Sequence, residues 1–334
     1  MFRTVRTQSV RTYGCNPVAA LSFLCSMLMI LIAAKKRSTV DALKEQLKYA
    51  FLMKDLGAAE HVLGVRIRRQ RDQRILYLSQ EKYIEKVLDR FNIADAKPLG
   101  VPLQPYVKIS KEDCPNSKDA TNDMESVPYA SACGSLMYAM VATRPDIAHA
   151  VGVVSRFMAN PGRLHWDAMK SIMRYLKGTK NKCLCYGKGP LELKGFCDSD
   201  MVGDVDTRKS TSGYVFTLAR GAVSWCSRLQ KIVALSTTEA EYISATEASK
   251  EAIWLARLCS EFGLPDKAPM LGCDSQSTIC LAKNAMFHSR TKHIDVRYHF
   301  IREVLEDGLI TLVKVHTSQN PIDALTKCLL KAQH

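Results

Sequence analysis

Four acidic residues in the second half of this 334-residue chain have the side-chain type and the placement of a two-metal site. Two-metal hydrolysis of a phosphodiester needs several carboxylates around two Mg²⁺ ions, and Mg²⁺ prefers oxygen ligands. Asp198 and Asp274 each end a short apolar run with the pattern of a strand. Glu241 lies near the start of a long helical pattern, and Asp323 follows Asn320-Pro321, a typical helix start. These four are the candidate catalytic and metal-ligating residues.

Each strand-end or helix-start carboxylate also has an ordinary structural explanation. Asp198 suits the beginning of a turn, and Asp274 suits the N-cap of a following helix. Asp323 in a first helical turn complements the helix dipole. Asp295, in His293-Ile-Asp-Val-Arg297, is a reserve candidate. Taken singly, the residues leave both interpretations open.

Helical phasing separates the two glutamates at the start of the long helical pattern. Ser236-Thr-Thr-Glu239 is a capping box, so we expect Glu239 to fold back onto the first amides of the helix. An apolar stripe with spacings of three and four follows at Ala245, Ala248, Ala252, Leu255, Leu258 and Phe262. Glu241 continues this stripe and should face the sheet, whereas Glu239 lies about 200° round the helix. Glu241 is therefore the ligand candidate.

The second half of the chain alternates strand and helix patterns. We expect strands over residues 191–198, 212–218, 222–226, 270–274 and 309–316. We expect a long helix over 237–262 and further helices over 275–283, 293–306 and 321–330. Hairpin-linked strands followed by strand–helix units predict an α+β or α/β fold on one mixed sheet.

The first half has a different organisation. Patterns there predict helices over residues 39–51, 80–91, 135–141, 145–158 and 165–176, with Ser79 preceding the second of them. Two strands, over 61–68 and 74–78, flank a polar turn, and residues 96–123 form a long polar connection. The polar connection is a natural domain boundary.

Composition and charge narrow the function classes. Hydrophobic residues make up 47% of the chain, which excludes collagen, coiled coil and wholesale disorder. Lys and Arg number 47 against 33 Asp and Glu, so the net charge is +14. Such an excess favours a polyanionic partner, either nucleic acid or an anionic membrane, although a basic protein without one is the alternative. The twelve cysteines include no Cys-x-x-Cys pair, which favours free thiols in a reducing compartment.

The N-terminal segment contains no acidic residue before Asp41. Arg3, Arg6 and Arg11 precede an apolar run over residues 18–34, a pattern shared by signal peptides and short for a membrane span. The alternative is a strand of a buried sheet.

Eight motifs along the chain belong together. They are Met53-Lys-Asp-Leu-Gly-Ala58, Leu78-Ser-Gln-Glu-Lys-Tyr-Ile84, Tyr129-Ala-Ser-Ala-Cys-Gly-Ser-Leu-Met-Tyr138, Thr143-Arg-Pro-Asp-Ile147, Arg208-Lys-Ser-Thr-Ser-Gly-Tyr214, Leu235-Ser-Thr-Thr-Glu-Ala-Glu-Tyr242, Thr291-Lys-His-Ile-Asp-Val-Arg297 and Asp323-Ala-Leu-Thr-Lys327. On these motifs the chain, from about residue 31 to about residue 330, resembles the C-terminal part of the Pol polyprotein of copia-type long-terminal-repeat retrotransposons.

The resemblance implies a domain order and two activities. It implies an unplaced N-terminus with a degraded palm strand at 1–37, the end of a reverse transcriptase palm at 38–105, thumb and connection helices at 106–188, and a ribonuclease H-like domain at 189–334. Ribonucleases H hydrolyse the RNA strand of RNA–DNA hybrids endonucleolytically, with two Mg²⁺ ions or Mn²⁺ as cofactors. The family's four-carboxylate site falls on the four candidates above, and a flexible histidine position falls on His316.

The implied partner is an RNA–DNA hybrid or other nucleic acid, with no small-molecule substrate. Hybrid recognition would rest on duplex shape and 2′-hydroxyls. The implied location is the cytoplasm or nucleus. Membrane or secretory targeting by the N-terminal run is the minor alternative, since that run resembles the relic of a palm strand.

The chain departs from the family at the polymerase site. Reverse transcriptases of this type carry a Tyr-Val-Asp-Asp-like strand where this sequence reads Ser26-Met-Leu-Met29, and both metal-binding carboxylates are missing. The fingers and upstream palm are also missing from this sequence. We therefore expect polymerase activity to be lost and ribonuclease H activity to be the function. The alternative is a non-catalytic retroelement remnant that binds nucleic acid weakly.

Overall fold

The computed structural model describes residues 2–7, 30–33, 36–50, 53–284, 294–317 and 320–330. Most of the apolar run at 18–34, including residues 26–29 of the expected palm strand, lies outside these ranges. Within them, no helix is long and apolar enough to cross a bilayer.

A small sheet opens the chain. Its strands β1 (Phe2–Thr7), β2 (Ile30–Ala33) and β3 (Met53–Ala58) lie in the order β2-β1-β3, and β1 is antiparallel to both neighbours. Helix α1 (Arg37–Ala50) confirms the helix predicted at 39–51. Lys44 of this helix is buried and forms an ion pair with Asp55 of β3.

A second, antiparallel sheet has the order β4-β5-β6-β7. Its strands are β4 (His61–Val62), β5 (Val65–Gln70), β6 (Ile75–Ser79) and β7 (Leu184–Tyr186). The single strand predicted at 61–68 is wrong, because the chain reverses at Leu63 and Gly64, which both have positive φ. Glycine adopts this conformation without steric cost, and it permits the tight turn.

Helices fill the segment between β6 and β7. They are α2 (Glu81–Arg90), η1 (Lys111–Asp113), α3 (Lys118–Glu125), α4 (Tyr129–Ala142), η2 (Pro145–Ile147), α5 (Ala148–Ser155) and α6 (Arg163–Gly178). Ile84 of α2, Leu136 of α4, Val151 of α5 and Ile172 of α6 belong to one buried core. The Ser79 hydroxyl accepts a hydrogen bond from the Glu81 amide at 3.2 Å, close to the predicted cap.

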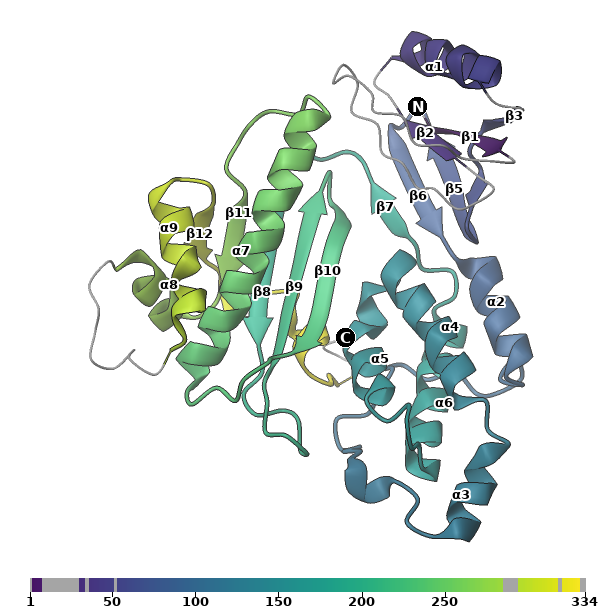
Figure 1. Ribbon diagram of the computed structural model, residues 1–334, viewed down its shortest axis with the longest axis vertical. Coiled ribbons are helices and arrows are strands. Elements are labelled where there is room, and N and C mark those ends of the chain that lie inside the picture. The colour runs from purple at the N-terminus through teal and green to yellow at the C-terminus, as the bar shows by residue number, and fades with distance from the viewer. Residues whose placement is uncertain are drawn as a thin grey trace.

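The third sheet is mixed and has the order β10-β9-β8-β11-β12 (Figure 1). Its strands are β8 (Lys194–Ser199), β9 (Thr211–Leu218), β10 (Gly221–Leu229), β11 (Met270–Cys273) and β12 (Thr311–Lys314). The strands β8, β9 and β10 are antiparallel, whereas β8, β11 and β12 are parallel. The predicted mixed α/β fold class is thereby confirmed.

Helices accompany this mixed sheet. They are α7 (Thr237–Glu261), α8 (Gln276–Lys283), η4 (Val296–His299), α9 (Phe300–Glu306) and α10 (Asp323–Thr326). Helix α7 crosses one face of the sheet (Figure 1). Ala245, Ala248, Ala252 and Leu255 of the predicted stripe are buried, whereas Leu258 is half-buried and Phe262 is exposed. The single helix predicted at 293–306 is instead a 3₁₀ turn followed by α9.

Candidate metal centre

Two of the candidate carboxylates lie at one edge of the mixed sheet. Strands β8 and β11 are parallel neighbours, and Cys197 is in register with Cys273. The next residues along each strand direction are Asp198 and Asp274. Because the carboxyl ends of parallel strands meet at the same sheet edge, both acids arrive at the same place.

Glu241 reaches this edge from α7. One ligand atom each from Glu241, Cys273 and Asp274 lie within 4.8 Å of one another, which is close enough to share a metal ion. Glu241 Oε1 accepts a hydrogen bond from the Ser199 amide at 3.4 Å, while Oε2 is buried and has no hydrogen-bond partner. An ionised oxygen in that position calls for a cation.

Asp323 approaches from α10, and its neighbours connect it to Asp198. The Thr326 hydroxyl, one turn after Asp323, donates a 2.6 Å hydrogen bond to Asp198 Oδ2. Lys327 forms a 2.8 Å ion pair with Asp323. The prediction that Asn320 caps this helix is wrong, because α10 begins after Ile322. The side-chain Nδ2 of Asn320 instead donates a hydrogen bond to the Cys197 carbonyl at 3.3 Å.

The carboxylates sit in one another's field. Burial raises the pKa of Glu241 to about 10, and the charges of Asp198, Cys273 and Asp274 add to that rise. Burial also raises the pKa of Asp198. The Thr326 hydrogen bond opposes this rise, and the charges of Asp274 and Asp323 reinforce it. Asp198 is thus within electrostatic reach of Glu241, Asp274 and Asp323, an arrangement that bound cations stabilise.

The second glutamate of α7 is occupied elsewhere. The Ser236 hydroxyl accepts a hydrogen bond from the Glu239 amide at 3.1 Å, and the Glu239 carboxylate accepts one from the Leu235 amide at 2.7 Å. The capping geometry expected from the sequence is therefore present, with Leu235 in place of the cap residue itself. The side chain of Glu239 is turned toward the start of the helix.

Two other sequence candidates lie outside the carboxylate cluster. Asp295 is exposed and caps η4 by accepting a hydrogen bond from the Arg297 amide at 3.1 Å. His316 is exposed and comes two residues after the end of β12, which pairs with β11. Its backbone position is therefore at the same sheet edge as Asp274.

Sequence reasoning missed three groups that surround the carboxylates. Thr326 bonds Asp198, the Lys314 ammonium donates to the Asp274 backbone carbonyl, and the Cys273 thiol lies beside Glu241. Only Thr326 carried a usable signal, since it lies one helical turn after Asp323. Contacts of the other two depend on strand pairing that the sequence does not specify.

The chain is similar to known reverse transcriptases and transposon proteins. Residues 20–105 match the family model described as reverse transcriptase (RNA-dependent DNA polymerase). The chain is 57% identical over 298 residues to the retrovirus-related Pol polyprotein from transposon TNT 1-94 of Nicotiana tabacum, covering 89% of this chain and 22% of that protein. It is 34% identical to a transposon Ty5-1 protein of Saccharomyces cerevisiae, covering 66% of this chain and 70% of that protein.

A solved structure is also similar. The foamy viral protease-reverse transcriptase in complex with an RNA/DNA hybrid aligns with 88% of this chain and 36% of its own, at 12% identity and a TM-score of 0.48. The reverse transcriptase match concerns residues 20–105 alone. The chain belongs to the Pol polyprotein family of copia-type transposons. It spans about a fifth of the length of the tobacco relative, at 22%.

Proposed function

We propose that the C-terminal part of this chain, residues 189–334, is a ribonuclease H that hydrolyses the RNA strand of an RNA–DNA hybrid. Asp198, Glu241, Asp274 and Asp323 would hold two Mg²⁺ ions, with Mn²⁺ as an alternative. The observation that carries the proposal is that Glu241 and Asp274 lie close enough to share a metal ion at the sheet edge that Asp198 also reaches, with Glu241 Oε2 buried and without a hydrogen-bond partner.

The donor set fits such ions. Carboxylate oxygens are the ligands that Mg²⁺ and Mn²⁺ prefer. Burial and neighbouring charges raise the pKa values of Asp198 and Glu241, so positive charge would stabilise their ionised forms, and Lys327 already forms an ion pair with Asp323. The Cys273 thiol lies within the same 4.8 Å group, but it is a softer donor than Mg²⁺ prefers.

Residues of the chain would orient the site. Bound ions of this kind activate a water molecule and stabilise the leaving 3′ oxygen of a phosphodiester. The Thr326 hydroxyl fixes one oxygen of Asp198, and the Ser199 amide fixes one oxygen of Glu241. In each case the second carboxylate oxygen remains for coordination.

The family resemblance supports the remaining assignments. We propose palm residues at 38–105, thumb and connection helices at 106–188, and an RNA–DNA hybrid as the partner, with no small-molecule substrate. The net charge of +14 supports binding led by the phosphate backbone. A nucleic-acid substrate favours the cytoplasm or nucleus. Polymerase activity is proposed to be lost, because the sequence reads Ser26-Met-Leu-Met29 where the family carries its two metal-binding carboxylates.

Cleavage of a hybrid by the full chain tests the proposal. A 5′-labelled RNA annealed to DNA should be cut internally with Mg²⁺ and left intact with EDTA, whereas the same RNA alone should survive. Asp198→Asn and Asp274→Asn should each lower the rate at least about a hundredfold, because the amide loses the charge that binds the ions. Full activity in either variant, or no cleavage by the unaltered chain, would contradict the proposal.

A further inference from the structure

Helix α10 brings two groups to the candidate site but is only one turn long. It spans Asp323–Thr326, and Thr326 is fully buried. An isolated single turn is not stable in water, because helix nucleation costs more than one hydrogen bond returns. The position of Asp323 must therefore be set by what α10 packs against.

One side of α10 lies directly on the backbone of β9. Gly213 of β9 is in register with Asp198 of β8. A Cβ atom added at Gly213 would meet Thr326 Cγ2 at 2.8 Å and Ile322 Cγ2 at 3.0 Å. The missing side chain is what allows Thr326 to come within hydrogen-bond distance of Asp198.

The α10 region also packs on the helical segment that precedes the mixed sheet. Ile322 and Leu325 are buried in one cluster with Ala148 of α5 and Val215 of β9. Met140 of α4 packs against the same cluster. Helix α10 contacts both η2 and α5. It is thus held between two parts of the chain that lie far apart in sequence.

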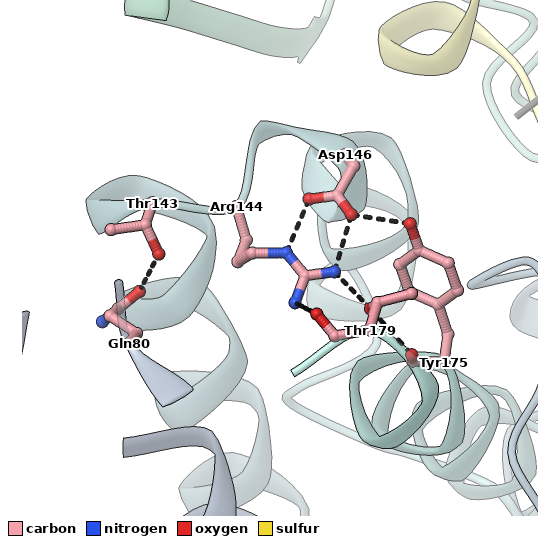
Figure 2. Close-up of polar contacts among 6 residues, drawn as sticks. All are labelled: Gln80, Thr143, Arg144, Asp146, Tyr175 and Thr179. Atoms are coloured by element: carbon pink, nitrogen blue, oxygen red, sulfur yellow. Dashed lines mark hydrogen bonds and ion pairs between the residues drawn. The ribbon is translucent and has the colours of Figure 1, made fainter. Parts of the chain in front are cut away.

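The helical segment is itself fixed where α10 rests on it. The buried Arg144 guanidinium donates to both Asp146 carboxylate oxygens, at 2.9 and 2.7 Å, and the Tyr175 hydroxyl donates to the same carboxylate at 2.6 Å (Figure 2). These bonds tie η2 to α6. A bidentate, buried pair of this kind is rigid as well as strong.

Two further bonds join this segment to the mixed sheet. The Trp225 indole of β10 donates to the Met140 carbonyl of α4 at 3.0 Å. Arg156, at the end of α5, forms a 2.7 Å ion pair with the buried Asp204. The contact between the two parts of the chain is therefore specific.

We propose that the helical segment 129–155 is a working part of the nuclease, because it positions α10 and thereby places Asp323 and the Thr326 hydroxyl against Asp198. The inference rests on the proposed function for its catalytic readout, but its structural content does not. In this view Ala148, Met140 and Trp225 are positioning residues. Residues 189–334 alone would lack one wall of the site that holds their fourth carboxylate.

The test uses the full chain and the variant Ala148→Leu. Ala148 is 1% exposed, so the larger side chain displaces α10, whereas Ala130→Leu adds the same atoms at an exposed position of α4. Displacement of a ligand by about an ångström should lower the cleavage rate about tenfold to a hundredfold in Ala148→Leu. The Mg²⁺ concentration for half-maximal rate should rise, and Ala130→Leu should change neither quantity.

A second readout does not depend on nuclease activity. Fe²⁺ bound in place of Mg²⁺, with ascorbate and hydrogen peroxide, cuts the backbone next to the metal. The unaltered chain should be cut near residues 198, 241, 274 and 323. Ala148→Leu should lose the cut near 323 and keep the others.

Each outcome decides one of the two proposals. A full cut pattern without hybrid cleavage would reject the proposed function and leave the positioning role standing. A cut near 323 that persists in folded Ala148→Leu would overturn the positioning role. Should Ala148→Leu fail to fold, Trp225→Phe decides instead. It keeps an aromatic ring but loses the bond to Met140, and an unchanged Mg²⁺ dependence there would reject the inference.

Discussion

At the scale of single residues, the two glutamates of α7 differ in what surrounds their carboxylates. Glu239 receives the Leu235 amide, whereas Glu241 has one buried oxygen without a hydrogen-bond partner. Glu241→Gln should lower hybrid cleavage at least about a hundredfold, because it removes a charge from the metal site. Glu239→Gln keeps an acceptor for the same amide and should leave the rate within about threefold. Initial rates at saturating Mg²⁺ measure both.

Glu241→Gln, which should lower the cleavage rate, should raise the stability of the metal-free protein. With its pKa raised from 4.5 to about 10, Glu241 is protonated in the metal-free folded protein at pH 7 and ionised in the unfolded one. This difference opposes folding above pH 4.5, and Gln removes it. Glu241→Gln should therefore raise the unfolding free energy in EDTA at pH 7 by about 3 kcal/mol, that is about 1.36 kcal/mol for each of the roughly 2.5 pH units above 4.5. A less stable Glu241→Gln protein, or an inactive Glu239→Gln protein, would contradict the assignment of the two roles.

Thr326 offers a test of orientation, separate from charge. Its hydroxyl donates to Asp198, so Thr326→Val removes the bond with little change in shape. We expect about a tenfold loss of rate and a higher Mg²⁺ requirement, because Asp198 is no longer held in one rotamer. Thr326→Ser keeps the hydroxyl and should retain most activity. Equal loss in the Val and Ser variants would mean that packing, and not the hydrogen bond, matters at this position.

At the scale of elements, the sequence predicts what depends on local pattern. Alternation and apolar runs predicted β8, β9, β10 and β11 within a few residues and placed Asp198 and Asp274 at strand ends, whereas the parallel pairing that brings the two acids together came from the structure. The reversal at Gly64 was missed, because a two-residue turn inside an apolar run leaves the alternation intact. The surface on which α10 packs was also missed, since its contacts with Ala148 and Gly213 depend on tertiary packing.

Gly213 tests the packing of α10 against β9. Gly213→Ala places a methyl group at 2.8 Å from the buried Thr326 Cγ2, which cannot swing away, so α10 must shift. We expect a rate loss of about tenfold and destabilisation by about 1–3 kcal/mol. Gly134→Ala in α4 is the matched control, because a Cβ there has nothing within 4 Å. Hybrid cleavage and thermal unfolding measure the two effects, and wild-type values for Gly213→Ala would show that α10 adapts freely.

At the scale of the whole molecule, separate cores are joined at α10. One core includes α2, α4, α5 and α6, a second includes α7, β8 and β11, and a small third cluster bridges them through Ile322 and Leu325. We call this third cluster the joint. It should open more easily than either core, because fewer apolar residues are buried in it. Changes that destabilise the joint should then act on global stability and on the candidate site together.

We expect His149 to make the contact between the two cores sensitive to acid. It lies on α5 and, with Asp146 and Lys327, lines a small cavity under α10, where its Nδ1 is buried without a hydrogen-bond partner. Burial lowers the pKa of His149 to about 4, and the charge of Arg156 adds to the effect. In the unfolded chain the pKa of His149 is about 6.5. As the pH falls, His149 is therefore protonated in the unfolded state before it is protonated in the folded state.

Stability contributed by neutral His149 is therefore complete above about pH 6.5 and declines as the pH falls toward 4. Between pH 7 and pH 5 the loss should be about 2 kcal/mol, following from the difference between the two pKa values. Gln does not titrate, so His149→Gln should lack this loss. Asp200 and Glu241, whose raised pKa values act in the opposite direction, are present in both proteins. The difference between the two proteins therefore reports on His149 alone. Denaturant unfolding of both proteins at pH 7 and pH 5, in EDTA, gives the comparison. Parallel losses in the two proteins would place the acid sensitivity elsewhere, whereas a flatter profile for His149→Gln would locate it at the joint that carries Asp323.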